Sequence, residues 1–270
     1  MDERDRALVA RLLDADPVQH CFVASRVEAG VLRDKTPGEL WGYPAYAPVS
    51  LLHVGANLAT VDADDLALDA FADDIGRWRT FVAIVGPSAH ALGLWHRLAA
   101  RWPAAYADAR LVRPRQLLMA RATPSPVPPD PRVALATPDV FESYLAGAVA
   151  MYREELDEDP LAGNREGYRR YVSTLVVGRR AYAIVEDGEV VFKADLGAIS
   201  ARAAQVQGVW VTPRLRGRGL SAPAMAAVTN AIVAGGRVSS LYVNDFNAPA
   251  IASYRRCGYD VVGELASVLF

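Results

Sequence analysis

A short segment rich in arginine and glycine, residues 214–219, carries the clearest chemical signal in the sequence. It reads Arg-Leu-Arg-Gly-Arg-Gly and follows an apolar run typical of a strand. After it, Met225, Val228 and Ile232 repeat at helical spacing, and Pro223 suits the first turn of a helix. Glycines allow the backbone to approach a ligand closely, and the unpaired N–H groups of a helix start bind phosphate oxygens. The segment therefore predicts a strand, an anion-binding loop and a helix.

A second segment, residues 240–259, places polar side chains after another predicted strand. Its apolar beginning predicts the strand, and Pro249–Arg256 predicts a helix that ends at Gly258, because glycine commonly follows a last helical turn. Asn247 precedes this helix and Tyr254 lies within it. The two segments together supply an anion-binding loop, an amide and a phenol.

The order Arg-x-x-Gly-x-Gly, then Asn247, Tyr254 and Gly258, resembles the two cofactor motifs of the GNAT superfamily of N-acyltransferases. The resemblance implies that residues 204–270 form the acyl-CoA-binding half of such an enzyme, with the cofactor pyrophosphate held at residues 214–219. It implies acetyl-CoA, or another acyl-CoA, as cofactor and an amine as acceptor. The residues that it places against the cofactor are Val209, Trp210, Val211, Arg214, Arg216, Gly217, Arg218, Gly219, Leu220, Ser221, Asn244, Asn247 and Tyr254.

The mechanism that the resemblance implies is direct attack of a neutral amine on the acyl thioester. By the same resemblance, Tyr254 lies near the sulfur and acts as the general acid that protonates the departing thiolate. Ile251 stands three residues earlier, so Tyr254 also fits the apolar face of an amphipathic helix. Both readings can hold together, since a tyrosine can bury its ring and expose its hydroxyl.

The general base is the part of the mechanism that the sequence leaves open. Some GNAT relatives carry a glutamate on the strand expected at Gln205–Val211, where this sequence has no carboxylate. One candidate is Asp195 on the preceding strand, and another is Glu155 in the acidic stretch 154–159, which the family fold places beside the acceptor. That stretch would suit a cationic acceptor, or it is simply a solvated loop. A water relay would also fit.

The leading hypothesis is an acetyl-CoA-dependent N-acetyltransferase whose acceptor binds between two domains. The missing strand carboxylate motivates an alternative, a non-catalytic protein that binds acyl-CoA as a sensor or interaction module. A third hypothesis is transfer of a longer acyl group, which a cavity around Trp210 would permit or block.

The domain boundary is predicted at residues 123–131, where five prolines remove backbone donors and favour a stiff, extended connector. Residues 132–270 are expected to form the GNAT domain, an α/β fold with a mixed sheet and splayed central strands. Residues 1–122 are expected to form a second α/β domain. That domain resembles either a degenerate GNAT copy or the domain of unknown function that precedes a GNAT domain in uncharacterised actinobacterial proteins. The alternative is an unrelated α/β domain that shapes the acceptor cleft.

Hydrophobic periodicity predicts the elements of both units. In the first unit we expect helices over 3–14, 18–29, 62–79 and 88–101, and strands over 50–54, 57–61, 81–85 and 116–120. The third helix is expected to bury Leu66, Leu68, Phe71, Ile75 and Trp78, and Ser88 to cap the fourth. The turn 85–88 is the nearest analogue of the glycine loop in this unit. In the second unit we expect strands over 132–136, 181–186, 190–196, 205–211, 239–243, 260–265 and 267–270, and helices over 139–151, 167–177, up to 234 and 249–256.

Composition limits the other classes of function. Hydrophobic residues make up 52% of the chain, and a net charge of -2 gives no basic footprint for nucleic acid. Cys21 and Cys257 are isolated and the histidines form no ligand spacing, so no metal is expected. No signal peptide or membrane span is apparent, which predicts a cytoplasmic protein. The sequence leaves its oligomeric state, monomer or homodimer, open. The excess of arginine over lysine suggests an actinobacterial, GC-rich origin.

Overall fold

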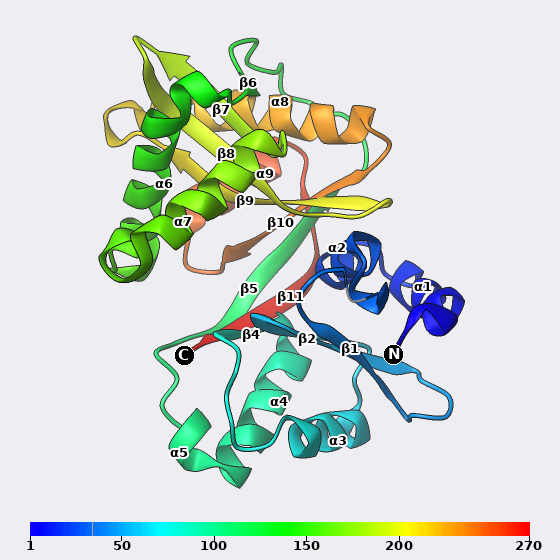
Figure 1. Cartoon of the computed structure of the whole chain (residues 1–270). Coiled ribbons are helices and arrows are strands. Elements are labelled where there is room, and N and C mark those ends of the chain that lie inside the picture. Colours follow the sequence, from blue (N-terminus) through cyan, green and yellow to red (C-terminus); the bar gives the residue numbers. More distant parts are fainter. Residues whose placement is uncertain (34) are drawn as a thin grey trace.

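The computed structural model describes residues 1–33 and 35–270. Within these residues, eleven strands form one mixed sheet in the order β1-β2-β3-β4-β11-β5-β10-β9-β8-β7-β6 (Figure 1). The first half of the chain contributes β1 (Glu39–Tyr43), β2 (Ser50–Val54), β3 (Asn57–Val61), β4 (Ala83–Pro87) and β5 (Leu111–Arg121). The second half contributes β6 (Ala134–Leu135), β7 (Ala181–Glu186), β8 (Glu189–Ile199), β9 (Ala203–Val211), β10 (Val238–Asn244) and β11 (Asp260–Leu269).

Helices cover both faces of this sheet. In chain order they are α1 (Arg6–Asp14), α2 (Cys21–Ala29), α3 (Asp65–Ile75), α4 (Ser88–Arg101), α5 (Pro103–Tyr106), α6 (Phe141–Leu156), α7 (Pro160–Val177), α8 (Ser221–Ala234) and α9 (Ala248–Arg256). Successive side chains of β8 point to opposite faces of the sheet in the second half of the chain. Phe192 packs in the core that contains α8 and α9, whereas Lys193 lies against Tyr144 of α6. The mixed α/β fold class expected from the sequence is confirmed.

The last strand of each half pairs with the other half. Strand β11 lies antiparallel between β4 and β5, and β5 in turn lies antiparallel between β11 and β10. Figure 1 shows these two long strands, β5 and β11, running side by side through the middle of the molecule. Residues 123–131 connect β5 to β6, but the sheet continues across this boundary. The division of the chain at that segment therefore remains a prediction.

The central strands β9 and β10 separate at one end, as expected for the splayed pair. They pair in parallel from Ala203↔Val238 to Val206↔Leu241, and beyond that point β9 runs on to Val211 without β10 beside it. Strand β9 is also bulged against β8, and Gly208 on it has a φ of +60°. The bulge increases local twist, which directs the rest of β9 away from β10.

Several predicted elements are confirmed closely. Strands β2 and β3 have the predicted bounds, and the β7–β8 hairpin turns at Asp187-Gly188, where both residues have positive φ. Helices α4 and α8 have the predicted ends at Arg101 and Ala234. These segments are predicted well because periodicity and turn residues agree locally.

Four predictions in the first half are wrong in detail, and one strand was not predicted. Helix α3 covers only Asp65–Ile75 instead of 62–79, because the Asp64 carboxylate caps its start and Gly76, with a φ of +70°, ends it. Leu66 and Trp78 are 66% and 74% exposed, so they are not part of its buried stripe. Strand β4 is shifted two residues later than 81–85, and β5 begins five residues earlier than 116. Strand β1 was not predicted, because its residues are mostly half-buried and do not alternate.

Ser88 is the first residue of α4 instead of its cap, and its hydroxyl donates a hydrogen bond to the Pro114 carbonyl. In the second half, α6 and α7 extend beyond their predicted ranges and β6 is reduced to two residues. The two strands predicted over 260–270 are one strand, β11, because two bulges against β5 interrupt its alternation. No helix among the described residues combines the length and the apolarity needed to cross a membrane.

Candidate functional site

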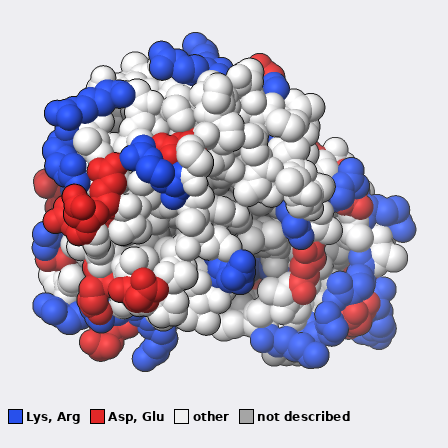
Figure 2. Space-filling view, turned by 90° about the horizontal axis from the view of Figure 1, so that it is seen from above, with Lys and Arg blue, Asp and Glu red and all other residues white. Residues whose placement is uncertain are grey.

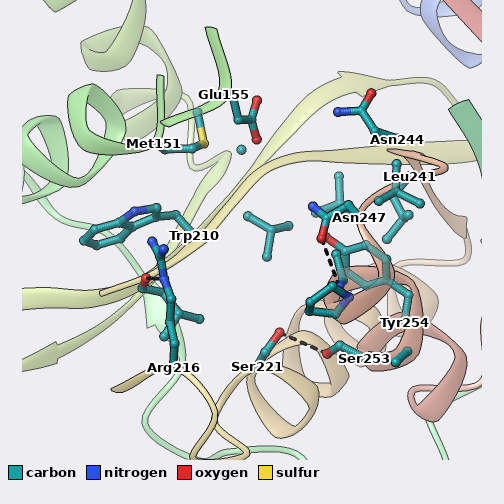
Figure 3. A pocket seen from close by; sticks show the side chains of 18 of the residues that line it. Met151, Glu155, Trp210, Arg216, Ser221, Leu241, Asn244, Asn247, Ser253 and Tyr254 are labelled. Atoms are coloured by element: carbon teal, nitrogen blue, oxygen red, sulfur yellow. Dashed lines mark hydrogen bonds between the residues drawn. The ribbon is translucent and has the colours of Figure 1, made fainter. Parts of the chain in front are cut away.

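A cavity of about 710 Å³ lies between the separated ends of β9 and β10 (Figure 3). Its walls are β9, β10, the glycine loop with the start of α8, and one face of α9, while β5 and the end of α6 close its far end. The residues predicted against the cofactor that line it are Val209, Trp210, Val211, Arg216, Gly217, Gly219, Leu220, Ser221, Asn244, Asn247 and Tyr254. The fold therefore brings two segments that are separate in sequence into one site.

The glycine loop is shaped by two positive φ angles. Gly217 has a φ of +72° and Gly219 a φ of +82°, conformations that strain any residue with a side chain. A Cβ atom at either position would meet no neighbouring atom within 4 Å, so it is the backbone conformation that requires glycine here. Helix α8 follows with Leu220 at its N-cap and no side-chain hydrogen bond to its first N–H groups. This helix start is therefore open to an anion.

The three arginines of the loop point in different directions. Arg216 faces the cavity, where Nη2 pairs with the Glu154 carboxylate at 2.7 Å and Nε donates to the Val211 carbonyl at 2.9 Å. Arg218 lines a second cavity of about 360 Å³, and Leu215, Gly219 and Leu220 line both cavities. Arg214 lines neither and lies 3.9 Å from Glu186 and 3.8 Å from Glu189.

The polar residues around α9 are held by hydrogen bonds. The Asn247 side-chain oxygen caps α9 by accepting from the Ala250 N–H at 3.2 Å, which leaves its amide NH₂ facing the cavity in Figure 3. Ser253 donates to Ser221 at 3.0 Å and so joins α9 to the start of α8. Asn244 accepts a hydrogen bond from Gln116 at 2.9 Å. These contacts position donors on the cavity wall without consuming all of them.

Tyr254 belongs both to the core and to the cavity wall. It is 7% exposed and packs in the cluster of α8, α9 and the central strands. Burial, with a smaller contribution from Tyr259, raises the pKa of its hydroxyl above the ordinary range. The hydroxyl therefore carries a proton at neutral pH. Its role as general acid stays a prediction.

The two base candidates lie in different environments. Asp195 is 5% exposed and pairs with Lys193 Nζ at 2.7 Å, accepts from the Tyr144 hydroxyl, and does not line the cavity. Glu155 lines the cavity next to Met151, as Figure 3 shows. Although its side chain is exposed, desolvation by the surrounding protein raises the pKa of Glu155, and the nearby Arg113 opposes this. Of the two, the structure brings only Glu155 to the cavity.

The Lys193–Asp195 pair lies directly behind the bulge of β9. Lys193 is fully buried and also donates to the Gly208 carbonyl at 2.7 Å. A Cβ atom at Gly208 would lie 2.5 Å from Asp195 Oδ2 and 2.9 Å from Lys193 Nζ. Only glycine fits here, and the Lys193 ammonium fixes the direction of the Gly208 carbonyl.

The acidic stretch 154–159 is divided between site and surface. Glu154 and Glu155 line the cavity, whereas Glu158 pairs with Arg110 and Asp159 with Arg153. Of the carboxylates in this stretch that were predicted to suit a cationic acceptor, only those of Glu154 and Glu155 line the cavity. Glu154 is further neutralised by Arg216 and accepts a hydrogen bond from Trp210 Nε1 at 3.3 Å.

Several other cavity residues have no signal in the local sequence. Arg113 and Gln116 come from β5, which reaches the site only because the halves exchange their last strands. Met151 at the end of α6 and Phe246 after β10 also line the cavity. Within residues 1–33 and 35–270, no three His, Cys, Asp or Glu side chains form a group suited to a metal ion. On the face shown in Figure 2, acidic and basic side chains are interspersed.

Comparison with known families assigns both parts of the chain. Residues 38–144 match the model of a domain of unknown function (DUF4081), and residues 146–259 match that of the acetyltransferase (GNAT) family. The search of curated proteins gave no match.

Solved structures similar to the whole chain include a Drosophila protein, with a TM-score of 0.63 and 15% identity over 97% of this chain and 96% of that chain. A GCN5-related N-acetyltransferase from Kribbella flavida has a TM-score of 0.54 and 19% identity, covering 92% and 95%. A tandem GNAT protein from the clavulanic acid biosynthesis pathway has a TM-score of 0.51 and 14% identity, covering 100% and 97%. At such identities the likeness shows the fold. Residues 146–259 are accordingly a domain of the acetyltransferase (GNAT) family, which follows a DUF4081 domain in this chain.

Proposed function

We propose that the protein transfers the acetyl group of acetyl-CoA to an amine by direct attack. The observation that carries the proposal is one cavity that joins an uncapped helix start at one end to the carboxylate of Glu155 at the other. The GNAT family uses acyl-CoA as donor and an amine as acceptor, which agrees with these two ends.

The glycine loop and the splayed strand would hold the cofactor. The N–H groups around Gly217, Gly219 and Ser221 point to a pyrophosphate site, because a helix start favours negative charge. Arg216 would contribute its charge once phosphate oxygens replace the Glu154 carboxylate as its partner. The unpaired edge of β9 at Val209–Val211 offers main-chain groups to an extended pantetheine arm. Bound acetyl-CoA supplies the thioester carbonyl that an amine attacks.

Glu155 is the proposed general base. A base near the acceptor has to remove a proton from an ammonium group so that the neutral amine can attack. Its raised pKa makes Glu155 a better proton acceptor than an ordinary glutamate. Because the ionised form is the active one, kcat/KM should rise with pH through a pKa above the usual glutamate range. Asp195 is held by Lys193 behind the strand and is not proposed as the base.

Tyr254 is the proposed general acid. Tyr254 lines the same cavity as Glu155, and its hydroxyl remains protonated because burial raises its pKa. It can therefore donate a proton to the leaving sulfur. The same raised pKa predicts that no loss of activity from ionised Tyr254 appears as the pH rises through neutrality.

Thiol release from acetyl-CoA, measured with a broad amine and peptide panel, tests the proposal. We expect turnover, with kcat lowered about 100-fold or more in Glu155→Gln and about 10- to 100-fold in Tyr254→Phe. Glu158→Gln is the matched control, since Glu158 pairs with Arg110 outside the cavity, and should behave like the unchanged protein. Binding of acetyl-CoA without thiol release from any acceptor would refute the transferase and identify a binding protein instead.

The length of the acyl group is tested by the same assay. Trp210 is 9% exposed and close to α6, so that a Cβ atom at Gly147 would lie 3.3 Å from its ring. Its indole N–H is held by Glu154. We expect this fixed wall to favour acetyl-CoA over butyryl-CoA, and Trp210→Ala to reduce the difference in kcat/KM.

A further inference from the structure

The end of the cavity away from the glycine loop combines one cation with the proposed base. Arg113, on β5, lines the cavity and donates from Nη2 to the main-chain carbonyl of Glu155 at 2.8 Å. The guanidinium is therefore bonded to the main chain of the same residue that carries the proposed basic carboxylate. Figure 3 shows Glu155 and Asn244 on opposite sides of this end of the cavity, with Arg216 and Ser221 at the other end.

Arg113 differs from the nearby arginines of the chain in whether a carboxylate neutralises its charge. Arg110 pairs with Glu158 at 2.5 Å and Arg115 with Glu264 at 2.7 Å. Among the residues that the structure describes, Arg113 has no carboxylate within ion-pair distance, and it is only half-buried. A guanidinium carries five N–H donors in a planar fork, so one bond to a carbonyl leaves donors free for an anion. Carboxylates match this fork with two parallel hydrogen bonds.

The amide side chains of Gln116 and Asn244, which also line the cavity, are held in a defined orientation. Gln116, which is 2% exposed, accepts from Ser267 at 2.7 Å and donates to the Asn244 side-chain oxygen at 2.9 Å. The bond from Gln116 fixes the Asn244 oxygen and therefore leaves its NH₂ group as a donor on the cavity wall. Two kinds of donor, guanidinium and amide, thus line the same cavity as the Glu155 carboxylate.

We propose that the acceptor is an amine with a carboxylate close to its amino group, as in a free amino acid. The Glu155 carboxylate takes the amine, and Arg113, helped by the Asn244 amide, takes the carboxylate. The inference rests on the proposed transfer to an amine and names the chemical class of the acceptor. It also gives the first half of the chain a role in specificity, because Arg113 comes from β5.

A purely structural role for Arg113 is the competing explanation. Its carbonyl partner, at Glu155, lies in the last turn of α6, where a cation stabilises the helix end. That role would affect folding and cofactor binding, and it would lower turnover of all amines equally. It would not change the preference between acceptors.

The experiment compares matched acceptor pairs that differ only in the carboxylate, such as phenylalanine with 2-phenylethylamine and leucine with isopentylamine. Thiol release gives kcat/KM for each member, for the unchanged protein and for Arg113→Gln, Arg113→Lys and Arg115→Gln. Arg115 lies on the same strand but outside the cavity, so its variant is the matched control. Thermal unfolding and acetyl-CoA affinity are measured for every variant.

We expect the amino acids to be preferred over their decarboxylated amines by about 10- to 100-fold, the size of a charged hydrogen-bonded contact. Arg113→Gln should lose most of this preference, Arg113→Lys should keep part of it, and Arg115→Gln should keep all of it. Equal use of both members, or a preference for the amines, would overturn the inference and leave the transferase intact. So would a preference that survives in Arg113→Gln. If acetyl-CoA binds but neither member of any pair gives thiol release, while other amines do, only the inference fails. If no amine is used at all, both proposals fail.

Discussion

The two halves of the sheet contain the same unit, two parallel strands joined by a helix, and they differ at the start of that helix. In the first half β3, α3 and β4 form the unit, and in the second half β9, α8 and β10 form it. The start of α3 therefore corresponds to the glycine loop, and the turn 85–88, which was predicted as its analogue, does not. The start of α3 is occupied by its own side chain, since the Asp64 carboxylate accepts from the Ala67 N–H at 2.8 Å. The start of α8 has no side-chain cap and follows two glycines with positive φ.

The charges around the two helix starts strengthen this difference. Asp62, Asp64 and Asp65 surround the start of α3, whereas Arg216 and Arg218 surround that of α8. At the start of α3 the Asp64 carboxylate satisfies one N–H group and the aspartates repel a phosphate, whereas the N–H groups at the start of α8 have no side-chain partner. We therefore expect an anion site at the start of α8, which lacks a cap and has arginines nearby, and none at the start of α3.

The largest effect we expect concerns the buried pair behind β9. Lys193→Met leaves the Asp195 carboxylate buried without its cation, which should lower the free energy of unfolding by about 3–5 kcal/mol. The double variant Lys193→Met with Asp195→Leu should recover part of this loss. Chemical denaturation measures both. Arg115→Gln breaks the exposed pair of Arg115 and Glu264 and should lower the free energy of unfolding by no more than about 1 kcal/mol. A similarly small loss for Lys193→Met would show that the pair does not hold the bulged strand.

The second prediction concerns the glycine loop of the second half, whose open shape is disrupted by two substitutions. Gly217→Val with Gly219→Val places β-branched residues at positive φ, which costs about 1–2 kcal/mol for each residue and should force the loop away from its anion-binding shape. We expect the affinity for acetyl-CoA, measured by calorimetry, to fall at least about 100-fold. Gly76→Val is the control, because Gly76 has a φ of +70° and equally open surroundings but lies in the first half. Its affinity for acetyl-CoA should not change.

The third prediction gives α8 the cap that α3 has. Leu220→Asp puts a carboxylate at the N-cap, where it satisfies the first N–H groups and repels phosphate, so we expect acetyl-CoA to bind about 10-fold more weakly. Leu220→Asn provides the cap without the charge and should have a smaller effect. Calorimetry at two salt concentrations separates the two contributions, since added salt should weaken only the effect of the charge. Unchanged binding in Leu220→Asp would mean that phosphate does not lie at this helix start.

The smallest effect is expected from the opposite change in the first half. Asp64→Ala removes the cap of α3 and should lower the free energy of unfolding by about 1 kcal/mol. Acetyl-CoA affinity should stay the same, because α3 lies outside the cavity. A gain of a second acetyl-CoA site in this variant would show that the cap alone prevents acetyl-CoA from binding at the start of α3.

The part of the site that could be predicted from sequence is local in the chain. Gly217 and Gly219 stand between a strand and a helix, and Asn247 stands at the start of another helix, so the residue types alone indicate backbone geometry and exposed donors. Eleven of the thirteen residues predicted against the cofactor line the cavity, and the exceptions are Arg214 and Arg218. Sequence spacing does not determine the direction of a long arginine side chain.

The rest depends on pairing between distant strands. Arg113 and Gln116 belong to a strand whose neighbours, β10 and β11, follow it by more than a hundred residues, so no local pattern indicates them. Asp195 was a candidate base because its strand was correctly predicted. Side chains two residues apart on a strand point to the same face, so Asp195 lies on the face of Lys193 and pairs with it instead of reaching the cavity.

A calorimetric titration of the whole chain with acetyl-CoA tests the central claim most directly. The difference between the two helix starts predicts one molecule bound per chain, and no measurable binding when Gly217 and Gly219 are both replaced by valine. Retained tight binding in that double variant, or a second molecule bound to the unchanged chain, would contradict it.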